Sequence, residues 1–344
     1  MGAGIAQVAL EAGHQVGLCD QSAEVLPSAT RRIRDGLTRR SATAGSGADW
    51  VDRCIARLEL RSTVADVAAG SDLVIEAVVE ELTAKRSIFR ALSAAAPPDA
   101  ILATNTSALS VAAIAASAAG PERVIGLHFF NPAPLMQLVE VVATPASDPA
   151  VVTDAIHLVT AWGKTPVRCT DSPGFIVNRV NRPFTLEALR MLESGEADTA
   201  TIDGAVRGAG FPMGPFELMD LIGIDVNLAA ARGVWEGLGR PDRLRPSPIQ
   251  ERLLAEGHLG RKTGQGFYRY DESGRGLGPV DVRADIPDRQ PHRVLDDQTI
   301  VSRIQDAIDA EARLAEAEGV ATDADIELAL RLGAGHPART PRVR

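Results

Sequence analysis

The run GIAQVALEAGHQVGLCD, residues 4–20, holds the pattern that decides the fold. Its first half, Gly4 to Ala12, is rich in small and apolar residues at helical spacing and is followed by Gly13, where helices commonly end. Its second half, Val16 to Asp20, is a short apolar run that ends at an acidic residue. A short apolar run of this kind is typical of a buried strand. A helix that leads directly into such a strand predicts part of a βαβ unit.

Further apolar runs continue this alternation along the chain. We predict strands at residues 73–77, 100–103, 124–129 and 138–143, with helices at 83–95 and 149–162 and a helical insertion at 28–61. Strands that alternate with helices imply a parallel sheet with helices on its faces. The sequence therefore predicts an α/β fold with a doubly wound parallel sheet.

The pattern changes after Asp171-Ser172-Pro173-Gly174. Amphipathic helical patterns follow at residues 175–193, 200–208 and 215–235. A Pro-Gly pair before a helical run is typical of a domain joint. We therefore predict one domain over residues 1–171 and an all-helical domain over 172–270, followed by a linker over 271–296, which is rich in Gly, Pro, Asp and Arg.

Beyond this linker the chain repeats itself. Residues 311–331 match residues 187–207 at a constant offset of 124, and GAGHP at 333–337 matches GAGFP at 208–212 after a slip of one residue. Residues 297–344 are thus predicted to be a partial second copy of the helical domain. The match ends there, so the copy looks unfinished, and its amphipathic face is expected to be covered by another chain.

The run GLHFFNP, residues 126–132, joins a candidate base to a candidate orienting acid. His128 lies near the end of one predicted strand, and Glu140 lies inside the next apolar run. An imidazole beside a carboxylate is suited to acid–base catalysis at neutral pH. The alternative is a buried structural histidine and a glutamate that caps or pairs elsewhere.

With NTS at residues 105–107 and DSPGFIVNR at 171–179, this pair resembles the 3-hydroxyacyl-CoA dehydrogenases, including the bacterial 3-hydroxybutyryl-CoA enzymes. The resemblance runs from Met1 to about Tyr270. It implies a Rossmann-type domain that binds NAD, a helical domain after it, an acyl-CoA substrate and a homodimer formed through the helical domains.

The resemblance also implies catalytic and substrate-binding roles. His128 would be the base, Glu140 would hold its imidazole, and Ser107 and Asn178 would contact the substrate oxygens, with Asn131 beside the acyl chain. Because Asn178 belongs to the helical domain, the site would be complete only when the two domains meet. The alternative for Ser107 and Asn178 is helix capping.

For the cofactor, MGAGIAQ at residues 1–7 resembles the family's phosphate-binding motif from just before its third glycine, with the first strand and two glycines absent. A gene model that starts at an internal Met is the expected explanation, and a genuine fragment or degenerate protein is the alternative. Gly2 would lie at the phosphates and Asp20 would accept the ribose hydroxyls, which favours NAD over NADP.

Three more cofactor contacts follow from the resemblance. They are Glu80, Lys85 and Asn105. Lys85 could instead pair with Glu80 or Glu81.

Composition excludes several other classes of protein. The 344 residues carry a net charge of −9, which argues against a nucleic-acid partner. The three cysteines are far apart and in no metal spacing, so we expect no metal and a cytoplasmic location. No apolar run is long enough to span a membrane. The scarcity of lysine beside arginine and alanine suggests a bacterial source.

Coenzyme A needs cationic partners for its phosphates. The candidates lie in the helical insertion and are Arg31, Arg32, Arg34, Arg39 and Arg40. The alternative is that these arginines only form a solvated helix face.

The resemblance implies an oxidoreductase that interconverts L-3-hydroxyacyl-CoA and 3-oxoacyl-CoA with NAD. The expected substrate is 3-hydroxybutyryl-CoA or 3-hydroxyadipyl-CoA, and the expected pathway is fatty-acid β-oxidation or phenylacetate metabolism. Two alternatives stay open: a dehydrogenase of free hydroxy acids such as gulonate on the same fold, and a truncated, non-catalytic relative that acts as a binding or structural protein.

Overall fold

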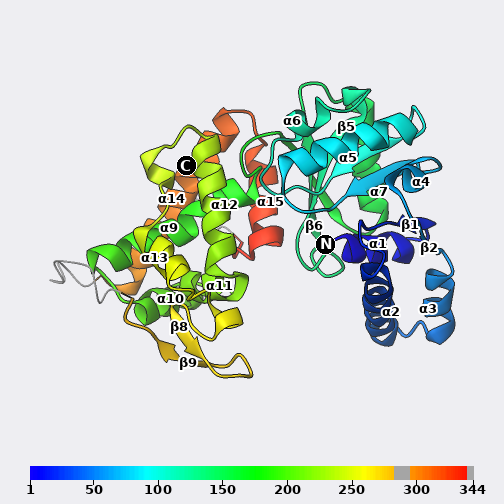
Figure 1. Ribbon diagram of the computed structural model, residues 1–344. Coiled ribbons are helices and arrows are strands. Elements are labelled where there is room, and N and C mark those ends of the chain that lie inside the picture. Colours follow the sequence, from blue (N-terminus) through cyan, green and yellow to red (C-terminus); the bar gives the residue numbers. More distant parts are fainter. Residues whose placement is uncertain (283–294, 339–344) are drawn as a thin grey trace. The chain divides into compact units, whose positions relative to one another are not determined.

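The computed structural model describes residues 1–282 and 295–338 and divides into two compact units, Met1–Phe175 and Ile176–Arg344 (Figure 1). The division lies between Phe175 and Ile176, four residues after the end of the predicted first domain. The second unit contains both the predicted helical domain and the predicted second copy. Within the described residues, no helix combines the length and the apolar character that crossing a membrane requires.

Strands of the first unit form two sheets. Strands β1 (Val16–Leu18) and β2 (Leu58–Leu60) pair in parallel with each other. The larger sheet has the order β3-β4-β5-β6-β7. Its strands are β3 (Leu73–Glu76), β4 (Ile101–Thr104), β5 (Val124–Phe129), β6 (Leu138–Ala143) and β7 (Thr165–Thr170).

The prediction of a purely parallel sheet is wrong at one place, because β5 and β6 run antiparallel. Only residues 130–137 join these two strands, and a parallel crossover requires a dozen or more residues. The other pairs in this sheet are parallel. Strands β2 and β7 were missed: β2 is three residues long at the end of the predicted insertion, and β7 alternates buried and exposed residues instead of forming an apolar run.

Helices of the first unit cover the strands and form a lobe beside them. They are α1 (Gly2–Glu11), α2 (Val25–Ala44), α3 (Ala48–Ile55), α4 (Val64–Ala68), α5 (Leu82–Ala95), α6 (Val111–Ala115), the 3₁₀ turn η1 (Pro121–Arg123) and α7 (Pro149–Ala161). The helical insertion is confirmed as α2 and α3, which lie side by side (Figure 1). Ile33 and Leu37, one turn apart on α2, are buried with Leu10 and Cys54 in a core of their own.

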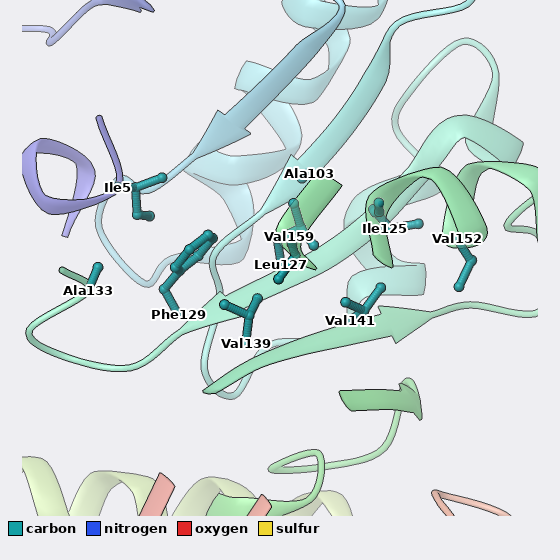
Figure 2. Close-up of a cluster of buried hydrophobic side chains, with 11 residues drawn as sticks. Ile5, Ala103, Ile125, Leu127, Phe129, Ala133, Val139, Val141, Val152 and Val159 are labelled. Carbon is teal, nitrogen blue, oxygen red and sulfur yellow. The ribbon is translucent and has the colours of Figure 1, made fainter. Parts of the chain in front are cut away.

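The main core of this unit lies on one face of the larger sheet (Figure 2). Its members include Ile125, Leu127 and Phe129 of β5, Val139 and Val141 of β6, and Val152 and Val159 of α7. Successive strand residues point to opposite faces, so this odd-numbered set fixes the even-numbered residues of β5 and β6 on the other face. His128 and Glu140 therefore share that other face.

The second unit is mainly helical. Its elements are α8 (Val177–Val180), α9 (Arg182–Ser194), α10 (Thr199–Gly208), α11 (Pro215–Ile222), α12 (Ile224–Gly237), η2 (Asp242–Leu244), α13 (Pro248–Ala255), η3 (Arg261–Thr263), β8 (Tyr268–Tyr270), β9 (Gly276–Pro279), α14 (Asp297–Ala317) and α15 (Asp323–Ala334). Two of the predicted helices are each divided, at Asn181 and at Gly223, whose φ of 103° no helix accommodates.

The all-helical prediction for this unit is wrong at the β8–β9 hairpin. Its second strand lies inside the predicted linker over residues 271–296. The turn between the strands is closed by Asp271, whose carboxylate accepts hydrogen bonds from the backbone N–H groups of Ser273 and Arg275. The rest of that linker, from residue 283 to 294, lies outside the described residues.

A buried carboxylate on α10 ties three elements of this unit together. Asp203 is fully buried and accepts hydrogen bonds from the backbone N–H groups of Phe216 (3.0 Å) and Glu217 (3.1 Å) and from the hydroxyl of Tyr268 (2.8 Å). It thus caps α11 and anchors β8. A Cβ at Gly214 would lie 2.3 Å from Asp203 Cγ, so only glycine fits there.

We expect Asp203 to make the stability of this unit depend on pH. Burial raises the pKa of its carboxyl to about 7, even though three donors favour the charged form. A group whose pKa is raised on folding holds its proton in the folded state to higher pH, so its contribution to stability falls as pH rises from 3.8 to about 7. Urea unfolding across this range should show a steeper loss of stability in the unchanged protein than in Asp203→Asn. Parallel curves for the two proteins would contradict this assignment.

Candidate active site

His128 and Glu140 are directly opposite each other on the antiparallel strands β5 and β6. His128 Nδ1 lies 2.6 Å from Glu140 Oε2, and both side chains are buried, with 6% of His128 exposed and none of Glu140. A carboxylate at this distance accepts a hydrogen bond from Nδ1–H, which leaves the lone pair of the neutral imidazole on Nε2. The predicted dyad is therefore formed, with a tautomer suited to taking a proton at Nε2.

Two aromatic rings surround this imidazole. The ring centroids of Phe130 and Phe175 lie 4.6 and 5.8 Å from that of His128. Phe175 has a positive φ of 51°, which a bulky residue rarely adopts. Phe130 belongs to the quoted run at residues 126–132, whereas nothing in the sequence singled out Phe175.

The loop after β5 is held by a buried lysine that the sequence did not identify. Lys164 Nζ donates hydrogen bonds to the carbonyl oxygens of Ala133 (2.7 Å), Pro134 (3.1 Å) and Met136 (2.9 Å). Its burial lowers the pKa of the ammonium group. Asn131, the predicted acyl-chain contact, is exposed at the start of this loop. Lys164 thus fixes the backbone that follows the dyad.

Asn105 connects the carboxyl ends of three strands. Its backbone N–H donates to Glu76 O at the end of β3 (2.7 Å), and its Oδ1 accepts from the N–H of Phe129 at the end of β5 (2.8 Å). Asn105 itself directly follows β4. Ligands of open α/β sheets bind at this edge, where the strands end. Asn105 thereby holds the strand end next to His128.

Glu80 organises the turn that carries Ser107. Its Oε1 accepts hydrogen bonds from Thr106 Oγ1 (2.6 Å), from the N–H of Ser107 (2.8 Å) and Ala108 (3.1 Å), and from Ser107 Oγ (3.3 Å). Burial alone would raise the pKa of Glu80, but these donors and the ammonium of Lys85 outweigh it, so the pKa is lowered.

Helix capping does not explain Ser107 or Asn178. The side chain that caps α6 belongs to Ser110, and Ser107 lies on the turn before it. Asn178 lies within α8, which Ile176 precedes as the N-cap residue. Asn178 is the only predicted site residue placed in the second unit.

Lys85 is almost completely buried, and its ammonium group pairs with two glutamates of the first unit. Its Nζ lies 2.7 Å from Glu76 Oε1 and 3.3 Å from Glu80 Oε2. Glu76 also accepts hydrogen bonds from Val78 N and Thr104 Oγ1, both at 2.7 Å. The pairing that the sequence left open is therefore with Glu80 and, unforeseen, with Glu76. A direct cofactor contact by Lys85 stays a prediction.

The predicted dinucleotide contacts Gly2 and Asp20 lie in the first unit. Gly2 begins α1, which has no acidic residue in its first turn, and a helix N-terminus of this kind favours a phosphate. Asp20 is exposed just after β1, and its carboxylate accepts a hydrogen bond from Ser22 N (3.0 Å). A carboxylate at the end of this strand suits ribose hydroxyls. These residues fit a dinucleotide.

The candidate arginines for coenzyme A are exposed along α2. Arg34 forms an ion pair with Asp52 (2.8 Å) and Arg40 with Glu11 (3.8 Å). Such contacts also occur on solvated helix faces. Both coenzyme A binding and a solvated helix face therefore stay open for these arginines. In the part of the chain that the structure describes, no cluster of His, Cys, Asp or Glu could hold a metal ion.

Comparison with known proteins extends this picture. Residues 1–172 match the model for "3-hydroxyacyl-CoA dehydrogenase, NAD binding domain" and residues 174–270 match that for "3-hydroxyacyl-CoA dehydrogenase, C-terminal domain". The chain is 49% identical to 3-hydroxyadipyl-CoA dehydrogenase of Escherichia coli over 78% of this chain and 56% of that protein, so it spans little more than half of that relative. It is 40% identical to the mitochondrial hydroxyacyl-coenzyme A dehydrogenase of Sus scrofa over 78% of this chain and 88% of that protein.

Solved structures agree with these matches. The crystal structure of 3-hydroxybutyryl-CoA dehydrogenase from Escherichia coli K12 has a TM-score of 0.88 at 37% identity and covers 98% of this chain and 87% of its own. That of (S)-3-hydroxybutyryl-CoA dehydrogenase from Ralstonia eutropha has a TM-score of 0.76 at 32% identity and covers 79% and 96%. With both of its domain models matched, the chain belongs to the 3-hydroxyacyl-CoA dehydrogenase family.

Proposed function

We propose that this chain interconverts L-3-hydroxyacyl-CoA and 3-oxoacyl-CoA, with NAD as the oxidant and NADH as the reductant. The observation that carries the proposal is the buried His128–Glu140 pair, with Nδ1 and Oε2 2.6 Å apart at the carboxyl edge of the larger sheet. An alcohol is oxidised when a base removes the hydroxyl proton while a hydride leaves the same carbon. His128 Nε2 is the nitrogen suited to that proton.

Each residue of the site has a separate task in this proposal. His128 takes the hydroxyl proton at Nε2, and Glu140 stabilises the imidazolium that forms. Bound NAD supplies the acceptor for the hydride. Ser107 and Asn178 hold the substrate oxygen, and Asn131 contacts the acyl chain. The rings of Phe130 and Phe175 keep water from the imidazole, which strengthens its interaction with Glu140.

Cofactor binding is proposed at the edge formed by the strand ends. Gly2 at the start of α1 would receive the phosphates and Asp20 the ribose hydroxyls. Asn105 and Glu80 hold the turns that face the nicotinamide end, and Lys85 fixes Glu80 by its charge. The match of residues 1–172 to the family's NAD-binding domain supports this assignment.

The substrate is proposed to be 3-hydroxybutyryl-CoA or 3-hydroxyadipyl-CoA, in fatty-acid or phenylacetate metabolism of a bacterial cytoplasm. The names of the relatives from Escherichia coli and Ralstonia eutropha support both acyl groups. The three free cysteines agree with a reducing compartment. Homodimerisation through the helical domain stays a prediction. Because α14 packs on α9 and α10 within this chain, such a dimer would need another surface of that domain.

The test is oxidation of NADH by the purified chain with three substrates: acetoacetyl-CoA, 3-oxoadipyl-CoA and free acetoacetate. We expect both thioesters to be reduced and the free acid to be inert. Reduction of the free acid at the same rate would point to a dehydrogenase of free hydroxy acids. A folded protein that reduces none of the three would contradict the proposed activity and favour a non-catalytic relative.

A further inference from the structure

The second copy forms helices at the positions that are equivalent to helices of the first copy. Residues 306–317 of α14 and the following Glu318 are equivalent to α9, and residues 323–332 of α15 are equivalent to α10, at the offset of 124. In the second unit α14 packs against α9 and α10, and both α14 and α15 pack against the short helix α8 (Figure 1 shows α14 along α9). The two copies therefore form an internal pair.

Ion pairs between the copies are reciprocal. Arg179 Nε lies 2.8 Å from Glu311 Oε1, and Arg303 Nε lies 3.1 Å from Glu187 Oε2. Arg303 is the equivalent of Arg179, and Glu311 is the equivalent of Glu187, at the same offset. Exchanging the copies thus converts one ion pair into the other. Contacts of this kind are the mark of a two-fold relation between two equal surfaces.

The ends of the two copies show the same reciprocity. The triplet at residues 210–212 is equivalent to that at 335–337. A Cβ built on the glycine of either triplet would lie against the proline of the other, at 3.7 and 3.0 Å. The middle residues, Phe211 and His336, contact each other, with ring centroids 5.1 Å apart. A residue that contacts its own equivalent lies on the local two-fold axis.

The copies differ at the residue with an expected role at the substrate. Asn178 precedes Arg179 in the first copy, whereas Ser302 precedes Arg303 in the second. The second copy has thus kept the arginine and glutamate that join the copies but has a different residue where the first copy has its asparagine.

Two side chains of the second copy bind α8 directly. Arg179 lies in this helix of four residues, and its side chain is completely buried. Its Nε bonds to Glu311 and its Nη1 to Glu318 at 2.6 Å, both on or at the end of the second copy's first helix. Glu311, which is 1% exposed, also binds Arg243 Nε at 2.7 Å. A helix this short has little rigidity of its own and is placed by such contacts.

We propose that the second copy is a built-in positioning element for Asn178. Glu311 and Glu318 fix Arg179, and through it they fix α8 and the adjoining Asn178 against the substrate oxygen. Both glutamates are positioning residues, since they act through Arg179. This inference rests on the proposed dehydrogenase function, in which Asn178 contacts the substrate.

The two-fold relation supplies a matched control for Glu311→Gln, and the ion pairs of Arg303 supply one for Glu318→Gln. Glu311→Gln weakens the hold on Arg179, and Glu187→Gln weakens the equivalent hold on Arg303, which adjoins Ser302. Glu318→Gln and Glu196→Gln form a milder pair, because these glutamates bind Nη1 of Arg179 and of Arg303. All four variants lose a bond at the same internal interface, but only two of them touch the arginine beside Asn178.

The experiment measures kcat and KM for acetoacetyl-CoA, the dissociation constant for NADH and the melting temperature of the unchanged protein, of these four variants and of Glu311→Asp. We expect kcat to fall about 10- to 100-fold in Glu311→Gln, since small displacements of a positioned group have effects of this size. Glu318→Gln should show a smaller loss, Glu311→Asp should recover part of it, and both controls should keep the kcat of the unchanged protein. NADH affinity should not change in any variant.

Equal kcat values in the folded members of each pair would overturn the positioning role. Should Glu311→Gln fail to fold, the comparison of Glu318→Gln with Glu196→Gln decides, because the side chain of Glu318 is 49% exposed and its loss is tolerated more easily. An unchanged protein that is folded but inactive would contradict the proposed function itself, and the positioning role would fall with it. The two failures are therefore distinguishable.

Discussion

Replacing His128 by Gln is expected to lower kcat for acetoacetyl-CoA reduction by about 10²- to 10⁴-fold, the usual contribution of a positioned general acid–base. Glutamine keeps a side-chain donor within reach of Glu140 but has no nitrogen that can take a proton at neutral pH. The buried carboxylate thus keeps a partner while the base is lost. Steady-state kinetics with acetoacetyl-CoA and NADH measure the effect.

The control for this variant is His157→Gln. His157 is exposed on α7, whose buried residues face the other side of that helix. We expect kcat to stay within about twofold of the unchanged value there, as for a surface substitution remote from the site. NADH affinity should be the same in both variants. A His128→Gln protein with the kcat of the control would show that the imidazole is not the base.

The dyad could be predicted because its signal is local. An apolar run that ends near His128 and a second apolar run that contains Glu140 place the two residues on neighbouring strands. The direction of the second strand was not foreseen, although the eight residues between the strands already exclude a parallel crossover. Chain length between strands was thus a usable signal that the apolar pattern alone did not provide.

Contacts between distant segments left no such signal. Asp171, quoted only as part of a motif, accepts hydrogen bonds from Ser110 Oγ and from the N–H groups of Val111 and Ala112, so it caps a helix 60 residues away. Lys164 binds three carbonyl groups of a loop about 30 residues before it. Neither side chain has a characteristic spacing to its partners, because backbone groups carry no sequence identity. Only the fold brings them together.

Among the changes to the first unit, we expect Lys85→Met to cost the most stability, about 3–5 kcal/mol of unfolding free energy, as when one partner of a buried ion pair is removed. The side chains of Lys85 and Glu76 are each 1% exposed, and their charged atoms are 2.7 Å apart. Methionine has a similar volume, so the loss comes from leaving the Glu76 carboxylate buried with only Val78 N and Thr104 Oγ1 as donors. Urea unfolding at pH 7, followed by circular dichroism, measures it.

Lys262→Met is the matched control, since Lys262 pairs with Asp225 at the surface of the second unit, where its side chain is 44% exposed. An exposed pair of this kind contributes about 1 kcal/mol or less. Adding Glu76→Gln to Lys85→Met should restore part of the lost stability, because the added substitution removes the unpaired buried charge. Were the double variant less stable than Lys85→Met, the cost would come from packing around the lysine stem and not from the carboxylate. Lys85 would then hold the strand end by its shape.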